Sequence, residues 1–239
     1  MTPRLVVTID GPAGTGKSTV AHLLAERLGL EFLDTGAMYR AAALLAIEDR
    51  IAPEDGPRLA ARLRVVGVSF DWSQDPPDIR LGGRSVASRI RDPDVNEVVS
   101  IVAAQPEVRR VMVEEQRAAA ASHPRLVTEG RDQGSVVFPD AEVRFYLEAD
   151  AGERARRRVE QLHAQGRPAD FEAVLAGIRE RDRIDSTRAD SPLRVPDGAI
   201  RIDTSHLPQE RVVALLKDAV ESALPASILR PHAAGGCSR

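Results

Sequence analysis

The chain has 239 residues, of which 43% are hydrophobic and 29% charged, a composition typical of a folded domain and not of a disordered chain. Its formal net charge of −3 lacks the basic excess of proteins that bind nucleic acid non-specifically. Its one cysteine, Cys237, excludes an internal disulfide and a multi-cysteine metal site. The sequence has no apolar run of about 18 residues to span a membrane, and its N-terminus lacks a signal-peptide pattern. We expect a cytoplasmic monomer that engages neither a membrane nor a nucleic-acid polymer.

The chain opens with a strand, a glycine-rich loop and a helix. Residues 4–9 form a β-branched apolar run, and residues 20–28 carry apolar side chains on one helical face before Gly29. Further runs predict four more strands and six more helices. The predicted strands cover residues 31–33, 126–128, 143–147 and 199–202, and the predicted helices cover 37–48, 55–63, 106–122, 152–165, 169–187 and 208–224. This alternation predicts an α/β fold with a parallel five-stranded sheet that has helices on both faces.

Residues 65–88 interrupt the alternation. Short runs lie there between glycine, proline and aspartate residues, at a density typical of turns in a small antiparallel unit. We interpret this stretch as a subdomain inserted into a single domain that covers residues 1–224. The tail from 225 to 239 is rich in alanine, glycine and proline, and we expect it to be flexible.

The loop after the first strand matches the phosphate-binding motif G-x-x-x-x-G-K-[ST]. Its glycines allow backbone N–H groups to turn inward around phosphate oxygens, and Lys17 reaches the β- and γ-phosphates of a nucleoside triphosphate. The hydroxyl of Ser18 is placed to ligate Mg²⁺. The predicted triphosphate-binding residues are Gly11, Pro12, Ala13, Gly14, Thr15, Gly16, Lys17, Ser18 and Thr19.

Three classes of protein share this loop. A GTPase reads guanine with an Asn-Lys-x-Asp motif, whereas Asn96 is the only asparagine here and Glu97 follows it. A motor-type ATPase has an apolar strand that ends in a magnesium-binding acid, and the candidates Glu129 and Glu148 lack the usual surroundings. The third class, kinases of small metabolites, needs an acceptor site and clustered arginines, and the chain has both features.

Three arginines on the predicted helix 152–165 share one face. Arg154, Arg157 and Arg158 could clamp a triphosphate while charge spreads over the moving phosphoryl group. On spacing alone, the same residues could form a solvated face with ion pairs to neighbouring glutamates.

Two more groups of residues remain open on spacing alone. Arg181, Asp185 and Arg188 share a helical face, either as a weak salt bridge or as a site for a phosphate and a hydroxyl. Arg131 and Asp132 directly follow a predicted strand, at the edge where open α/β sheets bind ligands.

At these residues the chain resembles the bacterial cytidylate kinases. The resemblance spans about residues 6–224, and the segments that carry it are TIDGPAGTGKST (8–19), LDTGAMYR (33–40), AAQPEVR (103–109), EGRDQGSVVFPDA (129–141), ERARRRVEQL (153–162) and RERDRIDSTRADSPL (179–193). It implies a P-loop fold, a monophosphate-binding insert at about 37–122 and a lid at about 151–168. The implied activity is Mg²⁺-dependent transfer of the γ-phosphoryl group of ATP to CMP or dCMP.

The resemblance also implies a role for each matching residue. Ser100, Arg109 and Asp132 match the positions that recognise the base, and a carboxylate suits the N4 amino donor of cytosine. The other acceptor residues implied are Asp34 and Thr35 at the end of the second strand, Tyr39, Arg40, Arg131 and Arg188 at the phosphate, and Arg181 and Asp185 at the sugar hydroxyls. Asp34 is also expected to contact Mg²⁺ through water.

We expect direct in-line transfer without a covalent intermediate. The catalytic residues implied are Lys17, Arg131, Arg157 and Arg188. Two alternatives stay open from the residues alone: a kinase of another small acceptor, such as UMP, shikimate or gluconate, and a nucleotide-dependent switch.

Overall fold

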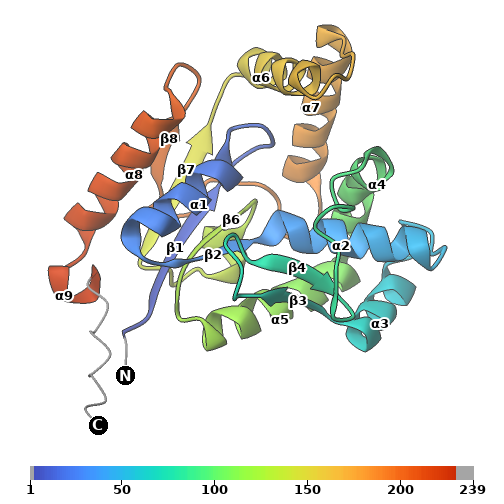
Figure 1. Cartoon of the computed structure of the whole chain (residues 1–239), viewed down its shortest axis with the longest axis horizontal. Coiled ribbons are helices and arrows are strands. Elements are labelled where there is room, and N and C mark those ends of the chain that lie inside the picture. Colours follow the sequence, from blue (N-terminus) through green and yellow to red (C-terminus); the bar gives the residue numbers. More distant parts are fainter. Residues whose placement is uncertain (1–2, 230–239) are drawn as a thin grey trace.

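A five-stranded parallel sheet forms the centre of the computed structural model, which describes residues 3–229 (Figure 1). Strand β1 (Leu5–Asp10) is buried over its whole length, as expected for a central strand covered on both faces. Every neighbouring pair of strands is parallel, which confirms the predicted α/β sheet. The spatial order is β2 (Glu31–Asp34), β6 (Arg125–Gly130), β1, β7 (Val143–Glu148) and β8 (Ile200–Asp203).

Side chains that alternate along β1 divide the core into two layers. Leu5, Val7 and Ile9 pack in one cluster with residues of α1 (Lys17–Leu28) and α8 (Gln209–Ala223). Val6 belongs to the opposite cluster, since successive side chains of a strand point to opposite faces. The helices that contribute to this second cluster are α2 (Thr35–Glu48), α3 (Gly56–Val66), α4 (Pro93–Ala104) and α5 (Pro106–Ser122).

Helix α4 is absent from the helices that we predicted, although its sequence carries the signals of one. Asp92 and Pro93 stand at the N-cap and at the first helical position, where both residue types are favoured. Val95, Val99 and Val102 are buried at spacings of four and three. The turn-rich insert directly before them obscured this start.

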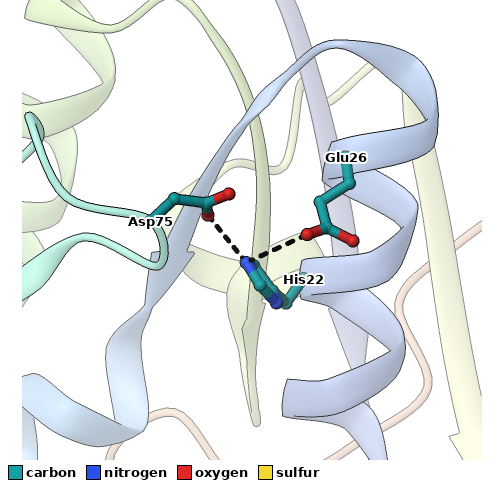
Figure 2. A group of neighbouring side chains, drawn as sticks. All are labelled: His22, Glu26 and Asp75. Atoms are coloured by element: carbon teal, nitrogen blue, oxygen red, sulfur yellow. Dashed lines mark hydrogen bonds and ion pairs between the residues drawn. The ribbon is translucent and has the colours of Figure 1, made fainter.

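The inserted subdomain predicted at residues 65–88 is a three-stranded antiparallel sheet, as expected, and is called the insert below. Its strands are β3 (Val68–Asp71), β4 (Asp78–Leu81) and β5 (Arg84–Ser85). Val68, Ile79 and Leu81 of this sheet are buried in the second core cluster, and Arg84 pairs with Glu48 of α2. At the edge of the insert, Nε2 of His22 in α1 lies 2.8 Å from an Asp75 carboxylate oxygen and 3.9 Å from a Glu26 carboxylate oxygen (Figure 2). Trp72 stacks on His123 at a centroid distance of 4.0 Å.

Helices α6 (Ala151–Ala164) and α7 (Phe171–Thr187) pack against each other beyond the ends of the strands, at the top of Figure 1. Within the tail, Ala226–Leu229 forms a short helix, α9, and Arg125 donates to the carbonyls of Ile228 and Leu229. Residues 230–239, with Cys237, lie outside the described range. None of the helices within residues 3–229 is long and apolar enough to cross a membrane.

Gly11 allows the loop after β1 to pack directly on β7. Its φ is +147°, and a Cβ at this position would lie 2.0 Å from the carbonyl oxygen of Leu147. Only glycine tolerates both the dihedral angle and the close approach.

We expect Gly11→Ala to lower the free energy of unfolding by about 1–3 kcal/mol, because the new methyl group meets backbone that cannot move aside. The matched control is Gly177→Ala in α7, where a Cβ meets nothing within 4 Å, and here we expect a gain of about 0.4–1 kcal/mol. Urea denaturation of both variants measures the difference. Equal stability of the two variants would contradict the packing described here.

Candidate active site

The glycine-rich loop leads from the end of β1 to the N-terminus of α1, where backbone N–H groups are left without helical partners. Gly11, Gly14 and Gly16 have φ values of +147°, +81° and +87°, so the loop adopts a backbone that other residues avoid. Lys17 is buried, and its Nζ donates to the carbonyl of Pro12 at 2.7 Å. Burial, followed by the nearby Arg131 guanidinium, lowers the pKa of Lys17 to about 7. The loop therefore combines N–H donors, a helix N-terminus and a cation, which together suit an anion.

Side-chain oxygens that could ligate a cation lie beside the phosphate-binding loop. The Ser18 hydroxyl donates to Glu129 Oε1 at 2.9 Å, and Glu129 lies next to Asp34 across the paired strands β2 and β6. Burial, together with the charge of Glu129, raises the pKa of Asp34 to about 6. A hydroxyl and two adjacent carboxylates are the hard oxygen donors that Mg²⁺ prefers, so these residues fit that ion. Glu129 is missing from the site residues that we predicted, although its place directly after an apolar strand is a signal for it.

The three arginines of α6 diverge instead of forming one clamp. Arg154 donates to Ala13 of the loop at 3.0 Å and pairs with Asp182 of α7 at 2.7 Å. Arg157 donates to the carbonyls of Thr204 and Ser205, at 2.6 and 3.0 Å. Arg158 donates to Gln161 on its own helix at 2.6 Å. Shared helical spacing did not predict this, because a guanidinium stands far enough from the backbone for neighbours to reach different partners.

A cavity of about 620 Å³ lies on the outer side of the loop, between α6 and the connection from β8 to α8. It is lined by Thr15 and Gly16, by Arg157 and by residues 204–209. The connection was not among the predicted site residues, because it carries no charge pattern or glycine signature. The cavity adjoins the phosphate-binding loop, as a pocket for the base of a bound nucleotide must.

A cluster of half-buried arginines surrounds one buried carboxylate, that of Asp185. Arg131 Nε lies 2.9 Å and Arg188 Nη1 3.8 Å from the oxygens of Asp185. Burial, followed by the charge of Arg131, lowers the pKa of Arg181 to about 10. Burial alone would raise the pKa of Asp185, but Arg131, Arg181 and Arg188 together hold it below its usual value. Asp10 and Gly130 pair across β1 and β6, so the loop after β1 and Arg131 leave the sheet at the same edge. After burial, Arg131 and Arg181 also lower the pKa of Lys17.

Next to this cluster, Arg109 of α5 forms a buried ion pair with Asp132, and its guanidinium lies 5.4 Å from the centre of the Tyr39 ring. Several buried donors here have no hydrogen-bond partner within residues 3–229. They are Tyr39 Oη, Arg109 Nε, Arg181 Nε and Arg188 Nη2. Buried polar groups are rarely left unpaired, so this concentration indicates a surface shaped for a polar ligand.

Four other predicted residues make contacts within the protein or lie exposed. Arg40 donates to Asn96 at 2.6 Å, and the Thr35 hydroxyl donates to the carbonyl of Glu129 at 2.6 Å. Ser100 is half-buried on α4, and Thr19 is exposed at a second cavity between α1 and the insert. The structure thus brings the guanidinium groups of 131, 181 and 188 together around Asp185.

Comparisons with known proteins agree with this geometry. The family model described as cytidylate kinase matches residues 7–222. The cytidylate kinase of Caldanaerobacter subterraneus subsp. tengcongensis is 44% identical over 90% of this chain and 93% of its own length. That of Rhodococcus opacus is 46% identical over 90% of this chain and 94% of its own.

Among solved structures, an uncharacterised protein from Eubacterium ventriosum superimposes with a TM-score of 0.50 at 13% identity. The match covers 92% of this chain and 99% of that one, and at this identity it concerns the fold alone. The family model covers most of the chain, and the sequence relatives exceed 40% identity over nine-tenths of it. This chain therefore belongs to the cytidylate kinase family.

Proposed function

We propose that this chain transfers the γ-phosphoryl group of ATP directly to CMP or dCMP, giving ADP and CDP or dCDP. Family membership supports this assignment. The observation that carries it is the cluster of Arg131, Arg181 and Arg188 around Asp185, directly beside the phosphate-binding loop. A triphosphate on the loop and a monophosphate on the cluster would meet end to end.

On the donor side, the loop residues 11–19 and Arg154 hold the triphosphate. Arg154 already contacts the loop at Ala13, so its charge stands beside the bound phosphates. Arg157 and the connection from Thr204 onward border the cavity that would take the adenine. Arg158 closes over the donor from the lid when α6 moves.

Mg²⁺ is part of the proposal. Ser18, Asp34 and Glu129 would hold it, directly or through water, because their oxygens adjoin the loop. The ion would neutralise charge on the phosphates of ATP.

On the acceptor side, Arg131 and Arg188 would bind the phosphate of CMP, with Arg40, Tyr39 and Thr35 at the border of its site. Arg181 and Asp185 would bind the sugar hydroxyls. Asp132 Oδ2 is occupied by Arg109, and its other oxygen has no protein donor within the described residues. That oxygen would accept the N4 amino group of cytosine, whereas uracil would present an acceptor to it. Ser100 and Arg109 would complete the contacts to the base.

The acceptor phosphate is already an anionic nucleophile, so the transfer needs no general base. The protein supplies alignment and charge neutralisation, chiefly through Lys17, Arg131, Arg157 and Arg188. Closure of α6 and α7 would exclude the water that could otherwise hydrolyse ATP.

The remaining expectations stay part of the proposal. The chain would act as a cytoplasmic monomer. One domain would cover residues 1–224, with the monophosphate-binding insert at about 37–122 and the lid at about 151–168.

A coupled assay of ADP release with CMP, dCMP and UMP tests the function. We expect efficient turnover with CMP and dCMP and weak turnover with UMP. Asp132→Asn should lower the preference for CMP over UMP by about tenfold or more, because the amide can donate to uracil as well as accept from cytosine. ADP release that is independent of every monophosphate would contradict the proposal.

Asp182→Asn is the matched control for this selectivity. It also removes a carboxylate paired with an arginine, but Arg154, its partner, faces the donor loop. We expect it to change the rate and to leave the ratio of CMP to UMP turnover within about twofold. An equal loss of selectivity in both variants would place the base elsewhere.

The lowered pKa of Lys17 predicts that ATP binding is coupled to proton uptake. Its lowered pKa, about 7, leaves most of the side chain neutral at pH 8, and the charge of a bound triphosphate would raise that pKa. Binding of ATP at pH 8 should therefore take up a proton, and affinity should fall as the pH rises from 7 to 9. Calorimetry in buffers of different ionisation enthalpy measures the uptake. Lys17→Met should abolish most of it, and an unchanged uptake in that variant would assign the proton to another group.

A further inference from the structure

Asp10 is a buried carboxylate that contacts none of the groups proposed to bind nucleotide. It is the last residue of β1, is fully buried, and directly precedes Gly11 of the phosphate-binding loop. Both of its oxygens are occupied by backbone donors. Oδ1 accepts from the N–H of Gln133 at 2.8 Å, and Oδ2 accepts from the N–H of Gly134 at 2.7 Å.

The two donor residues are the first two of the short π-helical turn Gln133–Val137, which directly follows Arg131 and Asp132. A carboxylate that binds two consecutive N–H groups fixes both peptide planes. The backbone of Arg131 and Asp132, directly before these peptide planes, is thereby oriented as well. Burial is costly for this group, since it raises the pKa of Asp10 to about 7 despite the two bonds. Buried carboxyl groups with a strongly shifted pKa cluster at functional sites.

The side chain of Gln133 is tied as firmly as its backbone. Its Oε1 accepts from the Thr128 hydroxyl at 3.0 Å, and its Nε2 donates to Gln116 Oε1 at 3.0 Å. All three side chains are fully buried. The turn is therefore held by β1 through Asp10, by β6 through Thr128 and by α5 through Gln116. Asp132 in turn pairs with Arg109, which lies about two helical turns before Gln116 on α5.

We propose that Asp10 is a positioning residue for the acceptor: it holds Arg131 and Asp132 at a fixed place relative to the first glycine of the phosphate-binding loop. The inference rests on the proposed kinase function and extends it. Asp10 touches neither nucleotide and acts through the backbone of residues 133 and 134. One side chain thus links the donor loop to the turn that carries the acceptor's phosphate and base contacts. Phosphoryl transfer is sensitive to this distance, since a displacement of about 1 Å can cost about 100-fold in rate.

Asp10→Asn tests the anchor with almost no change in shape. The amide oxygen can still accept one N–H, but the NH₂ group would face the second N–H and repel it. We expect the KM for CMP to rise about tenfold and kcat to fall about tenfold, with the KM for ATP within about twofold of wild type. The preference for CMP over UMP should fall as well, because Asp132 is displaced. Thr8→Val is the control: Thr8 is equally buried on the same strand, but its hydroxyl has no hydrogen-bond partner within residues 3–229, and we expect both KM values to be unchanged.

A uniform loss of active enzyme, with every KM and the base preference as in wild type, would overturn the inference. If Asp10→Asn does not fold, hydrogen exchange of the wild-type backbone amides tests instead whether Asp10 holds the turn. The N–H groups of Gln133 and Gly134 should be protected in nucleotide-free enzyme, and rapid exchange would show that the anchor does not hold the turn. A wild-type enzyme that does not phosphorylate CMP would contradict the proposed function, whereas an active wild type with an unaffected Asp10→Asn variant contradicts this inference alone.

Discussion

Cationic side chains held close together and shielded from solvent repel one another, and this repulsion is the main electrostatic feature of the site. Burial and mutual repulsion lower the pKa of Lys17 to about 7 and that of Arg181 to about 10. The carboxylate of Asp185, between Arg131 and Arg188, offsets part of the repulsion in the protein itself. The positive charge that Asp185 does not neutralise favours the binding of polyanions. Because the groups are already in place, little reorganisation is needed when charge develops during transfer.

The fold brings these groups together from distant parts of the sequence. Lys17 follows β1, Arg131 follows β6, and Asp185 lies near the end of α7. Parallel strands end at the same edge of a sheet, so the loop after β1 and the turn after β6 are neighbours. Two hydrogen bonds from the turn after β6 to Asp10 join this turn to the end of β1. The loop after β1 and the turn after β6 thus lie at one edge of the sheet, and α6 and α7 pack against each other beyond it.

Local patterns in the sequence predicted the parallel sheet, the antiparallel insert and the phosphate-binding loop, because each has a periodicity or glycine signature of its own. The convergence of 131, 181 and 188 followed from the family resemblance and not from spacing. Spacing was misleading for α6, where Arg154, Arg157 and Arg158 share a face but contact different elements. The connection after β8 was missed because its importance comes from neighbours brought close only by the fold. Glu129 was missed although it directly follows an apolar run in the sequence.

The most direct test of the account is the binding of one molecule that carries both nucleotides. In such a molecule adenosine and cytidine are joined 5′ to 5′ through five phosphates. If the loop and the arginine cluster face each other as described, it should bind at least about 100-fold more tightly than ATP or CMP and compete with both, because the second contact becomes intramolecular. Competition with only one nucleotide, or an affinity no better than that of ATP, would contradict a site in which the two phosphate chains meet.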